Sequence, residues 1–201
     1  MLASLACQTF SLGGSKQTSA VLFQDDFSNA SSGWKQAIGG DGIAHYDHNA
    51  YRISVSQPST DVWATPGFNF GDVRVEVDAS KVGGPDNNDF GVICRSTGSK
   101  SFYFFTISSD GYYGIGKFKS GVQILIGETS MQTSDKIRGG GQINHIRADC
   151  VGNTLTLFVN GAKIRTVTDS DFTSGDVGLI AGAFDTPGVD IQFEHFTVLK
   201  P

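Results

Sequence analysis

The chain has 201 residues, a formal net charge of −5 and a sequence pI near 5.2. Apolar residues make up 39% of it and charged residues only 17%, while glycine is abundant at 26 residues. The acidic balance and the lack of any run of five basic residues argue against a nucleic-acid partner. No stretch of about 18 apolar residues is present to span a membrane, and at this length we expect one main domain.

The first residues, MLASLACQTF, resemble the end of a bacterial lipoprotein signal, in which small and apolar residues lead into a lipidated cysteine. We therefore expect residues 1–7 to be the remnant of such a signal, with Cys7 as a lipid anchor. A positively charged start and an apolar stretch of about 7–15 residues are missing, so a leader with an unused thiol is the alternative. Residues 8–20 are polar and rich in Gly and Ser, as in a flexible tether, and 21–201 form the domain.

The rest of the chain predicts an all-β protein. No segment repeats apolar residues at i, i+3, i+4 and i+7 over three turns, so we predict no long helix. Short β-rich runs alternate instead with clusters of turn residues, and about a dozen such runs indicate an antiparallel sandwich or a barrel. The expected strands are 21–27, 51–56, 72–79, 90–96, 101–108, 112–119, 122–127, 144–150, 153–159, 162–168, 177–183 and 189–199.

Local signals refine this pattern. Asp110-Gly111 and Asn160-Gly161 predict two-residue hairpins, because both central residues tolerate positive φ. In 189–199 the apolar phase slips at Glu194-His195, which predicts a β-bulge. The run 102–107 is apolar on both faces. Either another layer covers its outer face, or that face is an exposed aromatic surface.

Several longer motifs carry a resemblance to known proteins. The chain opens with DDFS (25–28) and GW (33–34) and continues with DNNDFGVICR, FYFFTISSDGYYGIGK, HIRADCVG, LTLFVNG and SGDVGLIAG. These motifs resemble bacterial extracytoplasmic modules of the concanavalin A-like lectin/glucanase superfamily, which includes laminin G-like modules and 3-keto-disaccharide hydrolase-like domains. The resemblance covers about residues 23–200 and implies a two-sheet antiparallel jelly-roll sandwich. It does not select a function, because this superfamily contains lectins, hydrolases and inert interaction modules.

The stretch DVRVEVDASK (72–81) contains half of the E-x-D-x-x-E signature of family 16 glycoside hydrolases. Glu76 and Asp78 share one face of a strand, and a retaining glycosidase needs two carboxyl groups about 5 Å apart. However, the position of the acid/base is Lys81, which could act near neutral pH only if its pKa fell far. We therefore expect an outward polar row, with Arg74 beside Glu76 for cross-strand pairing, and no catalytic residue here.

The loop GGPDNNDFG (83–91) offers oxygen donors from Asp86, Asn88 and Asp89, and Ca²⁺ takes six to eight oxygen ligands. The spacing of an EF-hand is missing, and a plain turn between two strands has the same composition. A structural calcium site and a bare turn therefore both stay open. Other acidic residues that could contribute are Asp25, Asp26, Asp169, Asp171 and Asp185.

Cys94 and Cys150 both face the core if Arg95 and Arg147 face water. An extracytoplasmic location permits a disulfide between them, which would leave Cys7 as the lipidated residue. The alternative is a pair of buried free thiols, because spatial adjacency does not follow from sequence.

The aromatic run suggests a ligand surface. If Phe102, Phe104 and Tyr112 point inward, then Tyr103, Phe105 and Tyr113 point outward, near Arg95 and Lys117. Exposed aromatic rings stack against sugars while polar neighbours bind hydroxyl groups. The alternative is that the loop DVWATPG, around Trp63, covers this face. The candidate ligand-binding residues are Arg95, Tyr103, Phe105, Tyr113, Lys117 and Trp63.

These observations predict a secreted or cell-surface, non-catalytic recognition module, with carbohydrate as the leading ligand class. One alternative is a glycoside hydrolase that uses unrecognised carboxylates, and another is a self-associating structural protein. No G-x-S-x-G elbow is present, and the four histidines are interpreted as structural. Apart from calcium at the acidic loop, we expect no cofactor.

Overall fold

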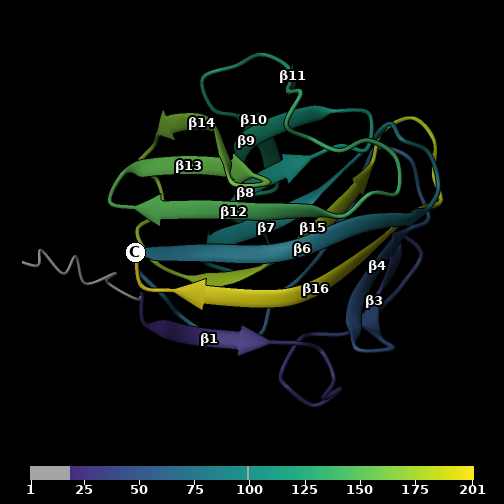
Figure 1. Ribbon diagram of the computed structural model, residues 1–201, viewed down its shortest axis with the longest axis horizontal. Helices are drawn as coiled ribbons and strands as arrows, with labels where there is room; N and C mark the ends of the chain where they lie inside the picture. The colour runs from purple at the N-terminus through teal and green to yellow at the C-terminus, as the bar shows by residue number, and fades with distance from the viewer. Residues whose placement is uncertain (1–18, 99) are drawn as a thin grey trace, which may run out of the picture.

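The computed structural model describes residues 19–98 and 100–201, where every helix or strand assigned is a β-strand. Two antiparallel sheets lie face to face, with β6, β12 and β16 of one sheet nearer the viewer in Figure 1 and β7 and β15 of the other behind them. The predicted all-β sandwich is thus confirmed. In the described part of the chain, no helix is long and apolar enough to cross a membrane.

The nine-stranded sheet has the order β14-β13-β12-β6-β16-β4-β3-β2, and β1 pairs with β16. Its strands are β1 (Val21–Asp25), β2 (Ala37–Ile38), β3 (Gly42–Asp47), β4 (Ala50–Val55), β6 (Val73–Gly83), β12 (Asn144–Val151), β13 (Thr154–Val159), β14 (Ala162–Thr168) and β16 (Val189–Leu199).

The seven-stranded sheet has the order β10-β9-β8-β7-β15-β5, and β11 pairs with β9. Its strands are β5 (Thr60–Ala64), β7 (Asn88–Ser96), β8 (Phe102–Ile107), β9 (Tyr112–Lys119), β10 (Val122–Leu125), β11 (Gln132–Thr133) and β15 (Asp176–Ala183). Each of the predicted strands corresponds to one of the observed ones, whereas β2, β3, β5 and β11 were not predicted.

Alternation places the main core between the two sheets. On β6, Val73, Val75, Val77 and Ala79 are buried against the other sheet, and the intervening side chains are partly exposed. Burial of each valine contributes roughly 1.5–3 kcal/mol. The predicted Cys94–Cys150 disulfide is present and ties β7 of one sheet to β12 of the other.

Turns and bulges follow the sequence signals in two of three places. Asn160 (φ 52°) and Gly161 (φ 82°) form the predicted two-residue connection between β13 and β14. His195 (φ 54°) lies where the register of β16 against β6 shifts, which confirms the predicted bulge. Asp110-Gly111 instead belongs to a longer connection, residues 108–111, in which the Gly111 N–H donates to the Ser108 carbonyl.

Candidate functional site

The strand β8 has the opposite facing to the one that we predicted. Tyr103 and Phe105 have no exposed surface and belong to the core between the sheets, so neither can contact a ligand. Tyr103 pairs directly with Cys94, and directly opposed residues in a sheet share a face. The disulfide turns Cys94 toward the other sheet, and therefore Tyr103 faces that way too.

Arg95 is also inside the protein, at 1% exposure, so its prediction as a surface ligand residue was wrong. The reason is a β-bulge: Arg95 has φ 54°, and the register between β7 and β15 shifts next to it. Its side chain turns inward and donates to the carbonyl oxygens of Gly152 (2.7 Å) and Phe172 (3.0 Å). It also pairs with Asp72 at 2.9 Å.

Two further candidates are engaged within the fold. Lys117 forms ion pairs with Asp169 and Asp171. Partial burial raises the pKa of the Asp169 carboxyl, but hydrogen bonds from Lys117 and Tyr103 outweigh that effect and leave it below its usual value. Burial, with this same hydrogen bond, raises the pKa of Tyr103 to about 12. Tyr113 is half-buried and packs against the core between the sheets.

The predicted calcium donors are not brought together. Asp86 forms an ion pair with Lys81, whereas Asn88 is fully buried and bonds to the Ser109 hydroxyl and to the carbonyl of Pro85. Asp89 lines a pocket on the outer face of the seven-stranded sheet. Within residues 19–98 and 100–201, no three His, Cys, Asp or Glu side chains are grouped to hold a metal. Calcium binding therefore stays a prediction.

Trp63 is the one predicted ligand residue that lies on the outer face of the seven-stranded sheet. It is half-buried, and its ring lies 5.3 Å from that of Phe102 and 5.8 Å from that of Phe118. Phe104 completes this group. We call Trp63, Phe102, Phe104 and Phe118 the outer aromatic face; Trp63 is its half-buried member, and the three phenylalanines are buried. The segment around Trp63, expected as a cover for the side of Tyr103 and Phe105, instead packs over Phe102 on the opposite side of β8.

Two pockets lie at opposite ends of β7 on this side of the molecule. The first has a volume of about 460 Å³ and is lined by Asp89, Phe104, Thr106, Leu125 and other residues. The second, of about 390 Å³, is lined by Trp63, Ser96 and others. Asp89 and Ser96 are seven residues apart on the strand, which corresponds to about 23 Å. The outer aromatic face thus has a pocket with a mixed polar and apolar lining at either end.

The first pocket contains a pair of carboxylates that we did not predict. In the register of the sheet, Gly182 of β15 lies between Asp61 of β5 and Asp89 of β7. A Cβ added at Gly182 would meet Oδ1 of Asp89 at 2.1 Å and Oδ1 of Asp61 at 2.2 Å. Both carboxylates therefore lie side by side above one glycine.

The environment of this pair favours its protonated form. Burial raises the pKa of Asp61 to about 6. Burial also raises the pKa of Asp89, which is only 3% exposed, and repulsion from the charge of Asp61 raises it further. A hydrogen bond with Thr106 lowers the pKa of Asp89 in part. Asp89 is buried and Asp61 half-buried, and two adjacent acids in such a place cannot both ionise readily. The pair therefore keeps a proton at pH values well above the usual pKa of a carboxyl group. The sequence signal that could have located it is Gly182, a glycine inside a strand.

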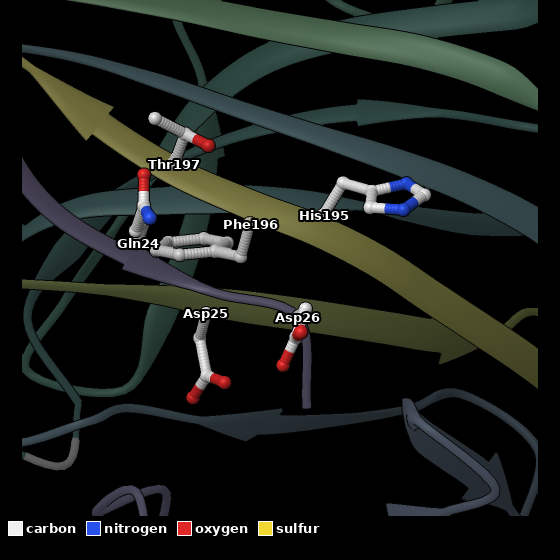
Figure 2. A pocket seen from close by; sticks show the side chains of 6 residues that line it. All are labelled: Gln24, Asp25, Asp26, His195, Phe196 and Thr197. Atoms are coloured by element: carbon white, nitrogen blue, oxygen red, sulfur yellow. The ribbon is translucent and has the colours of Figure 1, made fainter. Parts of the chain in front are cut away.

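A third pocket, of about 370 Å³, lies between β1 and β16 and is shown in Figure 2. Its acidic side chains do not converge with His195, which points away from Asp25 in this view. Asp25 accepts hydrogen bonds from the Trp34 indole N–H at 3.0 Å and from the Phe27 N–H at 2.8 Å. The DDFS and GW motifs therefore fix the N-terminal part of the fold.

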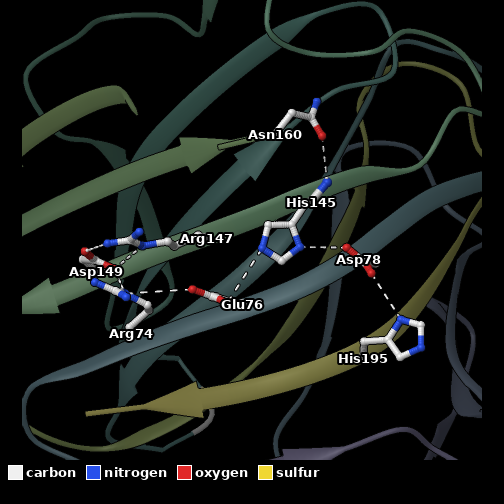
Figure 3. Close-up of polar contacts among 8 residues, drawn as sticks. All are labelled: Arg74, Glu76, Asp78, His145, Arg147, Asp149, Asn160 and His195. Atoms are coloured by element: carbon white, nitrogen blue, oxygen red, sulfur yellow. Dashed lines mark hydrogen bonds and ion pairs between the residues drawn. The ribbon is translucent and has the colours of Figure 1, made fainter. Parts of the chain in front are cut away.

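Glu76 and Asp78 lie on the outer face of the nine-stranded sheet (Figure 3). His145 and His195 both contact Asp78, with Nδ1–Oδ distances of 2.8 Å and 3.2 Å. Arg74 lies 3.9 Å from Glu76. The polar row predicted for DVRVEVDASK is thus present. Lys81 is held by Asp86 and by the carbonyl of Gly84.

Comparison with known proteins informs the fold. No family model matches the chain, and no curated protein matches its sequence. Among solved structures, it is similar to the carbohydrate-binding module CBM66 from Bacillus subtilis, with TM-score 0.68, 15% identity, and coverage of 84% of this chain and 96% of that one. It is also similar to a β-glucanase from Bacillus licheniformis, with TM-score 0.61, 12% identity, and coverage of 89% and 98%.

The fold is concanavalin A-like. A protein of unknown function with a galectin-like fold, also from Bacillus subtilis, matches at TM-score 0.63 and 13% identity over 90% of this chain and 96% of that one. At such identities the likeness concerns the fold alone. This fold is shared by carbohydrate-binding modules and glycoside hydrolases, so a function has to be argued from the residues of this chain.

Proposed function

We propose that this chain is a non-catalytic, extracytoplasmic carbohydrate-recognition module that binds a glycan on the outer face of its seven-stranded sheet. The observation that carries the proposal is the half-buried Trp63 of the outer aromatic face, with a pocket that contains polar side chains at either end of β7. Aromatic rings bind the apolar faces of sugars, and a few polar groups fix their orientation.

The extracytoplasmic location has support from Cys94–Cys150, because disulfides persist in oxidising compartments. As part of the same proposal, Cys7 attaches the module to a membrane through a lipid. Cys7 and residues 8–18 lie outside the described residues. The flexible tether predicted for 8–20 would separate the domain from the membrane surface.

A binding assay with a Trp63 variant tests the site. Affinity electrophoresis in gels that contain β-1,3-1,4-glucan, β-1,3-glucan or mannan should retard the wild-type protein in at least one. We expect Trp63→Ala to weaken that binding at least tenfold, equivalent to about 1.4 kcal/mol, because buried tryptophans dominate binding surfaces. If no glycan retards the wild-type protein at millimolar sugar concentration, the proposal is wrong.

Phe158→Ala provides the matched control. Phe158 is a half-buried aromatic residue on the outer face of the other sheet, where Arg147 lies 4.1 Å from its ring centroid. This variant should bind like the wild type. Equal losses in both variants would point to a general effect on folding, which thermal melting of each variant would reveal.

Hydrolysis is a second candidate, because Asp61 and Asp89 are two adjacent acids with raised pKa values. Retaining glycosidases separate their carboxyl groups by about 5 Å and inverting ones by more. Here, one oxygen of each carboxylate lies within 2.2 Å of the same point, which suits a shared proton better than separate acid and nucleophile roles. Release of reducing sugar from β-1,3-1,4-glucan, lost in Asp89→Asn, would establish the hydrolase instead.

A further inference from the structure

The pocket at the Asp89 end of β7 has an unusual charge environment. Asp89 is almost completely buried yet lines a pocket of about 460 Å³. Among the described residues, neither Asp89 nor Asp61 has an ion-pair partner. Thr106, the neighbour of Asp89, supplies only a hydroxyl group. A buried acid without a cation is costly, and such a group at the wall of a pocket calls for a ligand that can satisfy it.

Among the described residues that line this pocket, none carries a positive charge. Gly182 of β15 has no side chain, and the lining contains neither Lys nor Arg. Glu128 lines the pocket but is paired with Arg165. In the adjoining pocket, which shares Met131 and Phe184 with the first, the charged residues are Asp110 and Asp185. The charged residues that line the whole region are thus acidic, and Phe104 and Phe184 supply aromatic walls.

We propose that Asp89, positioned by Asp61, is the polar anchor of this pocket, and that it binds the hydroxyl groups of a neutral sugar and rejects sugars that carry a carboxylate. This inference rests on the proposed function and adds to it the class of ligand. A carboxyl pair that shares a proton both donates and accepts, as adjacent sugar hydroxyls require. A uronic acid would instead bring a further negative charge close to the pair, away from bulk water, where repulsion is strong.

The geometry separates the roles of the two acids. Asp89 lines the pocket and can contact the sugar. Asp61 stands beside Asp89 over Gly182 and acts through it. The charge of the pair increases as pH rises, so rejection of uronic acids should be stronger at pH 8 than at pH 5.

Matched probes test this selectivity. The protein is titrated with soluble β-1,3-1,4-glucan and with mannan, and with each polymer after oxidation of its C6 alcohols to carboxylates. We expect the wild type to bind one neutral polymer at least 100-fold more tightly than its oxidised form at pH 8. Asp89→Asn keeps the shape and removes one of the two ionisable groups of the pair, so this ratio should fall by about tenfold. Asp89→Leu removes the hydrogen bonds, and neutral binding should fall by at least tenfold.

Asp61→Asn reports on the positioning role, because it should reduce the pH dependence of the ratio. Asp185→Asn is the control: Asp185 is an exposed acid of the adjoining pocket, and its loss should leave the ratio unchanged. The inference is overturned if neutral and oxidised polymers bind equally, or if the ratio is unchanged in Asp89→Asn. Either result leaves the proposed function standing. Failure of every neutral polymer to bind overturns both.

Discussion

Arg95 contacts three separate segments of the chain from inside the protein. Its guanidinium donates to carbonyl oxygens of Cys150, Gly152 and Phe172 and pairs with Asp72. Asp72 also accepts the backbone N–H of Gly152. The residue therefore connects the end of β7 with the β12–β13 turn and with the segment that precedes β15.

Replacement of this arginine should be among the most destabilising changes in the protein. In Arg95→Met, several buried carbonyl oxygens lose their donor, and we expect the free energy of unfolding to fall by about 3 kcal/mol. Urea denaturation measures the loss. Arg138→Met serves as the control, because Arg138 is exposed and its side chain donates to one carbonyl, that of Ile143. A loss below about 1 kcal/mol in Arg95→Met would contradict this account.

The carboxylate pair predicts a dependence of stability on pH. The pKa of Asp61 is raised to about 6 in the folded state. Ionisation of Asp61 therefore destabilises the folded state at pH values above its unfolded-state pKa of about 3.9. The cost is absent at low pH, grows between about pH 4 and pH 6, and is complete by pH 8. Asp61→Asn should therefore be more stable than the wild type at pH 8, by on the order of 2 kcal/mol, and similar to it at pH 4. Thermal melts at both pH values, with Asp185→Asn alongside, measure the difference. A difference in stability that stays constant between pH 4 and pH 8 would mean that the pKa of Asp61 is not raised in the folded state.

At the level of single elements, the β13–β14 hairpin isolates the contribution of a turn glycine. Gly161 has φ 82°, and a Cβ there would meet no atom within 4 Å. Gly161→Ala therefore tests backbone strain alone, and we expect a loss of about 1–2 kcal/mol in stability. Gly39→Ala is the matched control, since it also has open space but no positive φ. Equal effects of the two substitutions in urea denaturation would show that the turn does not require glycine.

The strands themselves could be predicted because their periodicity is local. The valine row of β6 and the phase slip in β16 each follow from a few consecutive residues. The strands β2, β3, β5 and β11 were missed, because they are short or mix polar with apolar residues. Their strand conformation comes from pairing with partners that sequence alone does not identify.

Alternation of polar and apolar residues could not predict which side chains of β8 face the core. The six residues of β8 are all buried, and Thr106, the polar residue on its outer side, is buried too, so exposure does not mark that side. The information was present in combination: an inward Cys94 and an antiparallel β7–β8 pair together place Tyr103 inward. Glycines gave a second signal, because a Cβ at Gly116 would lie 2.2 Å from the Phe104 ring. Arg95 could not be placed in this way, since a bulge changes the phase without a sequence marker.

At the scale of the whole molecule, the candidate site exists only in the folded sheet. Asp61, Asp89, Thr106 and Gly182 come from β5, β7, β8 and β15, which are adjacent in the sheet order although β15 is distant from the others in the chain. Sequence predicted the sandwich and the Cys94–Cys150 bond, which are properties of the core. The acid pair depends on the order and register of strands, and no motif encodes these.

The disulfide cross-links the two sheets, and its removal tests how much this cross-link stabilises the fold. Cys94 and Cys150 are 56 residues apart, and closing a loop of this length stabilises the folded state by about 4 kcal/mol in the chain-entropy description. The double variant Cys94→Ala with Cys150→Ala should lose a large part of this stability in urea, whereas Cys7→Ser should lose none. Because the bond also holds β7 against β12, we expect β7 to be less ordered in the double variant. Glycan binding should therefore weaken at temperatures below the unfolding transition of that variant. Thiol titration of the denatured, non-reduced wild-type protein should find neither Cys94 nor Cys150 free. Reaction of Cys94 and Cys150 in that titration would mean that the bond does not form, and the extracytoplasmic location would then lose its support.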